Sequence, residues 1–515
     1  MKYIILIIFL LLSFNLVKSQ PADFTEKVDK YIEKAYKDWK IPGMAIAIIK
    51  DDKIIFEKGY GVKEINKPGK VDKNTMFGIA SNTKAFTASA IGILVDQGKL
   101  NWNDKVIKYL PYFKMYNDYV TNNFTISDLL SHHSGLKTFS GDLLWDATSY
   151  NRKEIIERIQ YLKPKYGFRA HYGYSNLMFL VAGQIITEVS DTNYDDFLKY
   201  HFFKPLKMDN TNSSIKYQNK ENLAIPHVEK NNKIIPIKYI SWDNIAPAGA
   251  INSTVDDMAK WIKLQLNQGK LDGKQYFSKE VSIKIKSSQT IEEISSSDRY
   301  FFPSMHFHTY GMGFDLFDYH GKKIVNHSGG LDGMISQVVM VPEENLGFVI
   351  LTNSINYLPT ALMYKILDIY FEKENLDYGA MFLKYYKFRQ NKVNKNNKQL
   401  YATINDSLKT KFDINKYTGT YEGKLYGNTT IKLKNNKLFL QFEPAKLFNS
   451  ELTHWQADTF LVEFKEFPSL PVGKAYFVYK NNKINELKID VPNPDFDFTE
   501  LKFYYKPNKN SENKE

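Results

Sequence analysis

The sequence predicts an α/β or α+β domain, in which one antiparallel sheet is flanked by helices and joined to a further helical region, followed by a small all-β barrel or sandwich. Strand-like runs lie at both ends of the first 380 residues, and helical patterns fill the stretch between them. Strands that begin and end a unit are typical of a domain whose termini meet in one sheet. Beyond residue 412, short β-type runs alternate with Gly and Asn turns, which indicates a second, smaller β domain.

The composition is that of a globular protein. Of 515 residues, 43% are hydrophobic and 24% are charged, which excludes a disordered chain, a collagen and a protein with many membrane spans. Lys and Arg outnumber Asp and Glu by 69 to 57, but only five of these cations are Arg and they form no cluster. We therefore expect no nucleic-acid partner. The absence of Cys excludes disulfides, thiolate metal sites and a Cys nucleophile.

The N-terminus has the pattern of a secretory signal peptide over residues 1–19. Lys2 precedes an unbroken apolar run at 4–12, and Val17 and Ser19 are small enough for cleavage after Ser19. The run is shorter than the roughly 20 apolar residues that cross a bilayer. We expect an exported protein, periplasmic or secreted, with no transmembrane segment after cleavage. A membrane anchor left in place is the alternative.

Three elements open the predicted first domain. Apolar residues at helical spacing over 28–36 predict a helix. Two β-type runs within 43–56, separated by a Lys-Asp-Asp-Lys turn, predict a hairpin. The mostly apolar stretch 80–97 predicts a buried helix that stops at Gly98.

The end of the chain returns to strands. β-Rich runs at 323–328, 335–341 and 346–352 complete the first domain, and a stretch of basic residues without acids follows from residue 384 to residue 398. The predicted parts are a signal peptide (1–19), the first domain (20–380), a basic connecting helix or linker (381–412), a small β domain (413–507) and a disordered tail (508–515).

Motifs of metal and nucleotide sites are absent from the sequence. It contains no His-Glu-x-x-His motif, P-loop, Rossmann fingerprint or Gly-x-Ser-x-Gly elbow. His306 and His308 have no carboxylate at ligand spacing, so we expect packing or loop positions for them. His132 and His133 would face opposite ways in an extended segment, and one is expected to be structural. We expect no metal ion and no cofactor.

Ser81 and Lys84, in the segment Ser-Asn-Thr-Lys, are the first candidates for chemistry. Residues three apart on a helix share a face, with Cβ atoms about 5–6 Å apart, so Lys84 would reach the Ser81 hydroxyl. Serine needs a neighbouring base to take its proton before it attacks. The start of a helix adds free backbone N–H groups beside this nucleophile.

The order of the motifs is more informative than any one of them. Ser-x-x-Lys occurs four times, with the other copies starting at Ser134, Ser213 and Ser511. Only the first copy opens a buried apolar helix. Tyr-Ser-Asn follows it at 174–176, and His-Ser-Gly lies on a late strand at 327–329.

With these motifs in this order, the sequence resembles the serine β-lactamase and penicillin-binding protein superfamily, in its class C β-lactamase-like branch of carboxypeptidases, esterases and D-aminopeptidases. The resemblance extends over about residues 22–371, and residues 416–502 resemble a small β domain appended to such enzymes. It implies a β-lactamase/transpeptidase-like fold. The stretches that carry it are MFGIASNTKAFTASAIGILVDQGKL, LLSHHSGL, HYGYSNLMFLVAGQII, PAGAINSTVDDMAKW, YGMGF and NHSGGLDGMISQVVMVPEENLGFVILTN.

The resemblance implies a role for each motif residue. Ser81 would be the acylated nucleophile, and Lys84 would accept or relay its proton. Tyr174 would act as the general base, for which a phenolate form is one option. It would then act as the acid that protonates the leaving group. Asn176 would hold Lys84 and the substrate amide by hydrogen bonds. His327 would lie across the site, on a strand edge.

The same resemblance implies where the substrate lies. The backbone N–H groups of Ser81 and Gly330 would form an oxyanion hole, in which each donor contributes about 3–4 kcal/mol. Ser328 and Gly329 would contact the substrate. The third motif is His-Ser-Gly where β-lactamases usually have Lys-Thr-Gly, so permanent positive charge for a substrate carboxylate is missing. A histidine with the ordinary pKa of about 6.5 would titrate within the physiological range.

We therefore expect a serine hydrolase that works through an acyl-enzyme on a small amide, peptide or ester substrate. Peptidase or esterase chemistry of the D-amino-acid type is favoured over efficient β-lactam hydrolysis. The alternative is a catalytically silent protein that binds peptidoglycan or peptide fragments on the same fold. The sequence does not indicate the oligomeric state or the role of the β domain.

Overall fold

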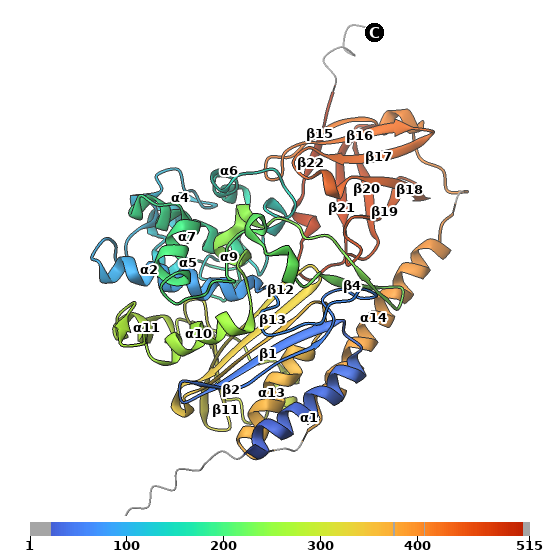
Figure 1. Ribbon diagram of the computed structural model, residues 1–515. Coiled ribbons are helices and arrows are strands. Elements are labelled where there is room, and N and C mark those ends of the chain that lie inside the picture. The colour runs from blue at the N-terminus through green and yellow to red at the C-terminus, as the bar shows by residue number, and fades with distance from the viewer. Residues whose placement is uncertain (1–21, 374–375, 406, 508–515) are drawn as a thin grey trace, which may run out of the picture.

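The computed structural model describes residues 22–373, 376–405 and 407–507. The expected signal peptide and the expected tail from residue 508 lie outside these residues. Within them, no helix is both long and apolar enough to cross a membrane. The chain forms one large domain built on a sheet and a smaller barrel at its C-terminal end, which is coloured orange to red in Figure 1. The predicted combination of the two fold classes is confirmed.

The first domain is built on an eight-stranded antiparallel sheet. Ile46 on an N-terminal strand pairs with Ile350 on the last strand of the domain, so the two ends of the domain meet as the sequence predicts. In spatial order, the strands are β2 (Lys53–Gly61), β1 (Gly43–Lys50), β14 (Leu346–Thr352), β13 (Met334–Val341), β12 (Lys322–Leu331), β11 (Asp315–Tyr319), β10 (His308–Tyr310) and β9 (Thr290–Ile291).

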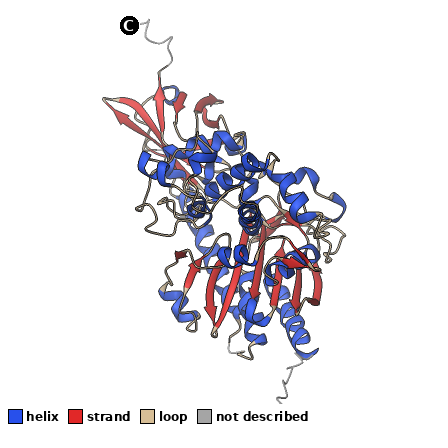
Figure 2. Ribbon diagram, turned by 90° about the vertical axis from the view of Figure 1, so that its left-hand side faces the viewer, coloured by secondary structure: helices blue, strands red, loops and turns tan. Residues whose placement is uncertain are grey.

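Apolar side chains on β1 alternate between two separate cores. Ala45 and Ala47 enter the core shared with the helical region, whereas Ile46 and Ile48 enter the core on the opposite face. A strand buried on both faces reads as a continuous apolar run rather than an alternating one. Three helices cover the second face of the sheet (Figures 1 and 2), namely α1 (Ala22–Trp39), α13 (Leu358–Tyr370) and α14 (Tyr378–Ala402).

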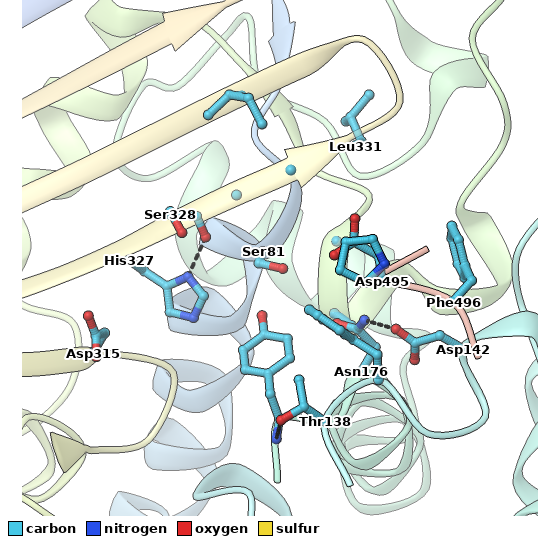
Figure 3. Close-up of a pocket in the computed structure, with 18 of the residues that line it drawn as sticks. Ser81, Thr138, Asp142, Asn176, Asp315, His327, Ser328, Leu331, Asp495 and Phe496 are labelled. Atoms are coloured by element: carbon cyan, nitrogen blue, oxygen red, sulfur yellow. Dashed lines mark hydrogen bonds between the residues drawn. The ribbon is translucent and has the colours of Figure 1, made fainter. Parts of the chain in front are cut away.

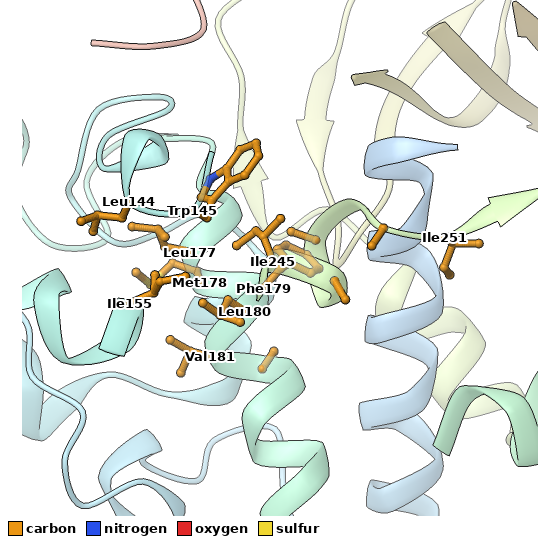
Figure 4. Packing of buried hydrophobic residues seen from close by; sticks show 14 of the residues in the cluster. Leu144, Trp145, Ile155, Leu177, Met178, Phe179, Leu180, Val181, Ile245 and Ile251 are labelled. Atoms are coloured by element: carbon orange, nitrogen blue, oxygen red, sulfur yellow. The ribbon is translucent and has the colours of Figure 1, made fainter. Parts of the chain in front are cut away.

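The helical region covers the first face of the sheet, and its central helices α2 and α7 are apolar along most of their length. Figure 4 shows the packing around α7, where Leu177, Phe179 and Leu180 are fully buried. The helices of this region are α2 (Thr83–Asp96), α3 (Val106–Tyr109), α4 (Asp118–Asn123), α5 (Ile126–Leu130), α6 (Arg152–Arg158), α7 (Asn176–Ser190), α8 (Tyr194–Leu198), α9 (Ala246–Gly249), α10 (Val255–Leu266) and α11 (Lys279–Ile285). The short helix α12 (Ser296–Phe301) lies between β9 and β10 in the sequence.

Within the described residues, three short strand pairs lie outside the large sheet. The pair β3 (Phe77–Gly78) and β6 (Asn252–Ser253) leads directly into the first turn of α2. The other pairs are β4 (His227–Lys230) with β5 (Lys233–Pro236), and β7 (Lys270–Leu271) with β8 (Lys274–Gln275).

The C-terminal domain is a closed eight-stranded barrel. The sequence is compatible with either a barrel or a sandwich. The first strand pairs with the last through Tyr421 and Tyr505, so no edge is left over. Its strands are β15 (Gly419–Glu422), β16 (Thr429–Lys434), β17 (Lys437–Phe442), β18 (Ser450–Gln456), β19 (Thr459–Val462), β20 (Gly473–Lys480), β21 (Lys483–Asp490) and β22 (Phe503–Lys506).

The connection expected at 381–412 is mostly one helix. This helix, α14, begins at Tyr378 and packs its first turns on the large domain, where Trp39 Nε1 donates to the Gly379 carbonyl at 3.1 Å. The expected helix at 80–97 also differs at its start, because Ala80–Asn82 forms a 3₁₀ turn before α2 begins at Thr83.

Gly183 lets α7 and α9 approach closely. A Cβ atom at this position would lie 2.1 Å from Pro247 Cγ. We expect Gly183→Ala to lower the free energy of unfolding by about 1–3 kcal/mol, because overpacking forces the two helices apart. Gly167→Ala is the matched control, since its nearest contact would be an ordinary 3.5 Å. Equal melting temperatures for the two variants would contradict this packing argument.

Candidate active site

Ser81 lies in the tight turn between β3 and α2, at the inner end of the helix. Ala80 before it adopts a left-handed conformation with φ of 45°, which is uncommon for a residue with a side chain. The turn is fixed to β13 by Ser336, whose Oγ donates to the Ile79 carbonyl at 2.7 Å and accepts from Asn82 Nδ2 at 2.8 Å. Residues before and after the predicted nucleophile are therefore hydrogen-bonded to the sheet.

The Lys84 side chain is completely buried beneath Ser81. Its Nζ lies 2.9 Å from Ser81 Oγ, 2.7 Å from Asn176 Oδ1 and 2.9 Å from the Ala248 carbonyl oxygen. A neutral amine has two N–H donors and one lone pair. The two carbonyl-type oxygens take the two donors, which leaves the lone pair for the Ser81 hydroxyl.

Burial lowers the pKa of Lys84 to about 7, and the Asp142 carboxyl opposes this shift. A substantial fraction of Lys84 is therefore neutral near pH 7, as a general base requires. Asp142 is itself buried, and the same loss of hydration raises its pKa to about 7.

Asn176, the first residue of α7, connects these two groups. Its Nδ2 donates to Asp142 Oδ2 at 2.6 Å (dashed in Figure 3), so its Oδ1 is the atom that faces Lys84. Asp142 therefore fixes the orientation of the Asn176 amide. Asn176 could be predicted from the sequence but Asp142 could not, because nothing in the local sequence separates Asp142 from other loop carboxylates.

Tyr174 lies on the other side of Ser81. Lys84 Nζ is 4.8 Å from the centre of its ring. Burial raises the pKa of the Tyr174 hydroxyl far above its ordinary value, although a hydrogen bond with the Ser81 side chain lowers it. Tyr174 therefore stays protonated at physiological pH. This disagrees with the sequence-based expectation of a phenolate base and favours a role as proton donor or relay.

His132 packs against Tyr174 and holds the backbone of the next residue. Its Nδ1 accepts from the Ser175 backbone N–H at 3.0 Å, and its ring lies 4.4 Å from the Tyr174 ring. His133 instead contacts Ser131 and Thr290 through its two ring nitrogens. The two adjacent histidines thus separate as expected, and both take supporting positions.

The edge of β12 forms the wall opposite Tyr174. The strand β11 pairs with β12 only as far as Asn326, and within the described part of the chain no strand pairs with this edge beyond that point. Ser328 and Gly330 are exposed towards the cavity. Gly329 is buried, and a Cβ there would lie 2.9 Å from the Ser81 backbone nitrogen. Gly329 is thus required for the close approach of strand and nucleophile.

His327 contacts a residue that the sequence analysis did not name. Its Nδ1 must donate to the Ser328 carbonyl oxygen at 2.5 Å, so its Nε2 accepts from the Tyr310 hydroxyl at 3.0 Å. Burial and the nearby Lys84 lower the pKa of His327 to about 4. The expectation that His327 titrates in the physiological range is therefore wrong, because the side chain is largely buried and lies near Lys84.

These residues border one cavity of about 720 Å³. Figure 3 shows Ser81 at its centre, with Asp315 beyond His327 on one side and Asp142 on the other. Of the predicted site residues, Lys84 alone does not line the cavity, because it lies beneath the surface. The other seven all line it, namely Ser81, Tyr174, Asn176, His327, Ser328, Gly329 and Gly330.

The barrel contributes part of the cavity wall. Pro494, Asp495 and Phe496 reach the cavity from the loop between β21 and the end of the barrel, and Figure 3 shows Asp495 and Phe496 near Asp142. Glu500 holds this loop against the large domain, because its carboxylate accepts from Ser140 Oγ at 2.5 Å and from the Gly141 backbone N–H at 2.8 Å.

The other Ser-x-x-Lys copies do not enter the cavity. Ser134 and Ser213 are buried, and neither lines it. Ser511 lies outside the described residues. The order of the motifs therefore selected the one copy that faces an open cavity.

Comparison with known families divides the chain in two. The family described as beta-lactamase matches residues 28–362, and a domain of unknown function, DUF3471, matches residues 392–505. The first match spans the sheet and the helical region, and the second spans the barrel with the last turns of α14.

Named relatives cover different shares of the chain. A protein named unguisins hydrolase ungD' from Aspergillus campestris is 29% identical over 437 residues, covering 79% of this chain and 77% of that protein. Protein flp from Staphylococcus aureus strain N315 is 30% identical over 348 residues, which cover 65% of each chain. The octameric penicillin-binding protein homologue from Pyrococcus abyssi has the same fold, with a TM-score of 0.59 and 21% identity over 93% of this chain and 99% of that one.

Phe496 should limit the size of the groups that reach Ser81. Its ring lies 6.1 Å from that of Trp145, which also lines the cavity. We expect Phe496→Ala to raise, by about tenfold, the labelling rate of a bulky fluorophosphonate relative to a small one. Tyr504→Ala is the control, because Tyr504 is a half-exposed barrel residue that does not line the cavity. The same ratio in both variants would exclude this role for the barrel loop.

Proposed function

The chain belongs to the beta-lactamase family of serine hydrolases, and from this premise we propose that it is an exported enzyme that cleaves a small amide, peptide or ester through an acyl-enzyme on Ser81. The observation that carries the proposal is the geometry of Lys84. Its buried amine donates to the Asn176 side chain and the Ala248 carbonyl, and its third contact is the Ser81 hydroxyl. The relative from Aspergillus campestris is named a hydrolase, which supports the same class of reaction.

Acylation begins with the transfer of the Ser81 proton to neutral Lys84, as Ser81 Oγ attacks the substrate carbonyl carbon. The carbonyl oxygen gains negative charge and is stabilised by the backbone N–H groups of Ser81 and Gly330. The bond to the leaving group then breaks. The proton returns from Lys84 through the protonated Tyr174 to the leaving nitrogen or oxygen.

Deacylation repeats these steps with water as the nucleophile. Neutral Lys84, with Tyr174 as the relay, takes a proton from the attacking water, and the Ser81 oxygen recovers a proton when the acyl group leaves as a carboxylic acid. Asn176 keeps the Lys84 amine in place during both halves of the reaction. Asp142 keeps Asn176 oriented and does not contact the substrate in this scheme.

The neutral state of His327 bears on the substrate. A side chain with a pKa of about 4 carries no charge near neutral pH, so the strand edge offers no cationic side chain of its own for a carboxylate. Peptidase or esterase activity is therefore favoured over efficient β-lactam hydrolysis. Substrates of the D-amino-acid type form the first class to screen, together with small esters.

Export is supported by the sequence of residues 1–19, which combines a basic start, an apolar run and small residues before the cleavage point. N-terminal sequencing of the protein recovered from outside the cytoplasm tests this part of the proposal. A chain that retains Met1 and the apolar run would contradict it.

Ser81→Ala should abolish covalent labelling by a fluorophosphonate and lower kcat/KM by about 10⁴-fold or more, because the nucleophile is lost. The melting temperature should stay unchanged, since the hydroxyl contributes little packing. Ser213→Ala is the matched control, as it alters a rival Ser-x-x-Lys copy away from the cavity. Normal folding without any labelling of the wild type would favour the silent peptide-binding protein instead.

The pH dependence of kcat/KM should follow Lys84. Because the neutral amine is the active form and burial lowers the pKa of Lys84 to about 7, kcat/KM on a neutral ester should fall about tenfold per pH unit below that value and level off above it. The apparent pKa belongs to the coupled pair of Lys84 and Asp142. The measurement is a pH profile of the wild type.

His327→Gln separates this explanation from titration of His327. This variant should keep the same acidic limb, because His327 is already neutral at pH values well above about 4. Loss of the limb in His327→Gln, or a flat wild-type profile between about pH 5 and 8, would contradict the assignment to Lys84.

A further inference from the structure

Three potential metal ligands meet at the outer edge of the large sheet, in the wall of the same cavity. Glu292 follows β9, His308 begins β10 and Asp315 begins β11. One ligand atom from each lies within 4.8 Å of the other two. All three residues line the cavity that contains Ser81. The sequence showed no such cluster, because a hairpin register, not local spacing, brings Asp315 beside His308.

The separations between these atoms suit a small divalent cation. His308 Nε2 lies 2.7 Å from Asp315 Oδ1 and 3.8 Å from Glu292 Oε1. Nitrogen and oxygen ligands of Zn²⁺ at about 2.0–2.2 Å in a tetrahedral site are about 3.3 Å from each other. The two observed distances bracket this value, so small side-chain rotations would bring the three atoms into coordination.

Glu292 Oε1 is the second observation that points to a ligand. This oxygen is buried and has no hydrogen-bond partner. Buried carboxylate oxygens are normally satisfied by donors, and an unsatisfied one requires an explanation. A second carboxylate, that of Asp315, lies in the same cluster. A divalent cation would satisfy the unpaired Glu292 oxygen and bind both carboxylates.

Neighbouring side chains hold Asp315 in place. Asn326 Nδ2 donates to Asp315 Oδ2 at 2.9 Å and is itself held by Gln337, as the supporting shell of a metal site requires. In the described residues, the only side-chain cation within 4 Å of Glu292 or Asp315 is His308. Other polar groups near the cluster are Tyr172, Tyr174, Tyr310, Tyr364, His327 and Asp298.

We propose that Glu292, His308 and Asp315 bind one divalent cation of the zinc type. One imidazole and two carboxylates match the ligand preferences of Zn²⁺, and the open cavity side leaves a fourth position for water or substrate. The ion would lie on the His327 side of Ser81 (Figure 3). It would supply the fixed positive charge that the His-Ser-Gly motif lacks, and so favour substrates with a carboxylate on the leaving group.

Zinc binding to the mature full-length protein tests the site directly. After treatment with a chelator, titration calorimetry with ZnCl₂ should show one equivalent bound. His308→Ala and Glu292→Gln should each weaken this binding by about 100-fold or more, because each removes a ligand. Ser81→Ala should bind zinc as the wild type does, so this test is independent of the acyl-enzyme proposal.

The chain provides a matched control in the same hairpin. His306 Nδ1 lies 2.8 Å from Asp318 Oδ2, but this exposed pair has no third ligand among the described residues. His306→Ala should leave zinc binding unchanged. Stoichiometric binding that survives in both His308→Ala and Glu292→Gln, or no binding by the wild type, would overturn the proposal. If His308→Ala has a lowered melting temperature, Glu292→Gln decides, because it keeps the shape of the side chain.

The role of the ion has its own measurement. Zinc should raise kcat/KM for an ester with a carboxylate on its leaving group relative to the neutral ester by at least about fivefold. This preference should disappear in Glu292→Gln. Equal effects of zinc on both esters would overturn the assigned role in substrate selection.

Discussion

The burial of Lys84 is the constraint on which the rest of the site depends. An ammonium group without water is costly, and proteins relieve this cost by neutralising the group or by pairing it. Here the amine has no carboxylate in direct contact but two neutral oxygen acceptors, from Asn176 and Ala248. The environment therefore favours the uncharged amine, and an uncharged amine beside a serine hydroxyl is a base. The apolar packing that stabilises α2 and α7 is also what creates the reactivity of Ser81.

The same constraint explains why two helices and a strand edge must approach so closely. Lys84 reaches its acceptors only if α9 lies against α7, which Gly183 permits, and Ser81 meets the strand edge only because Gly329 has no side chain. At each of these positions, a side chain would clash with the neighbouring element and push the two elements apart. Fixed approach distances of this kind give a pre-formed site, in which few groups must reorganise during the reaction.

The sequence predicted the parts of this arrangement that depend on local spacing. Ser81 and Lys84 are three residues apart on one helix, and β1 and β14 form apolar runs at the two ends of one domain, so neither inference needed tertiary information. The state of His327 could not be predicted in this way, because its pKa depends on burial and on Lys84, which is far away in the sequence. The choice of a closed barrel likewise depends on the pairing of β15 with β22, which lie at opposite ends of the β domain in the sequence.

The residues that select the substrate lie in other parts of the chain than the residues that react with it. The reacting groups come from the first domain alone, whereas the cavity around them is completed on one side by the barrel loop at Phe496 and on the other by the edge strands that present Asp315. These two walls are far apart in the sequence, and neither is hydrogen-bonded to Ser81 or Lys84. A change in either wall can therefore alter which substrate fits while Ser81 and Lys84 keep their geometry. The catalytic centre must keep its shape for the reaction to occur, but the surrounding walls need not. We therefore expect proteins of this fold that act on different substrates to differ mainly in these walls.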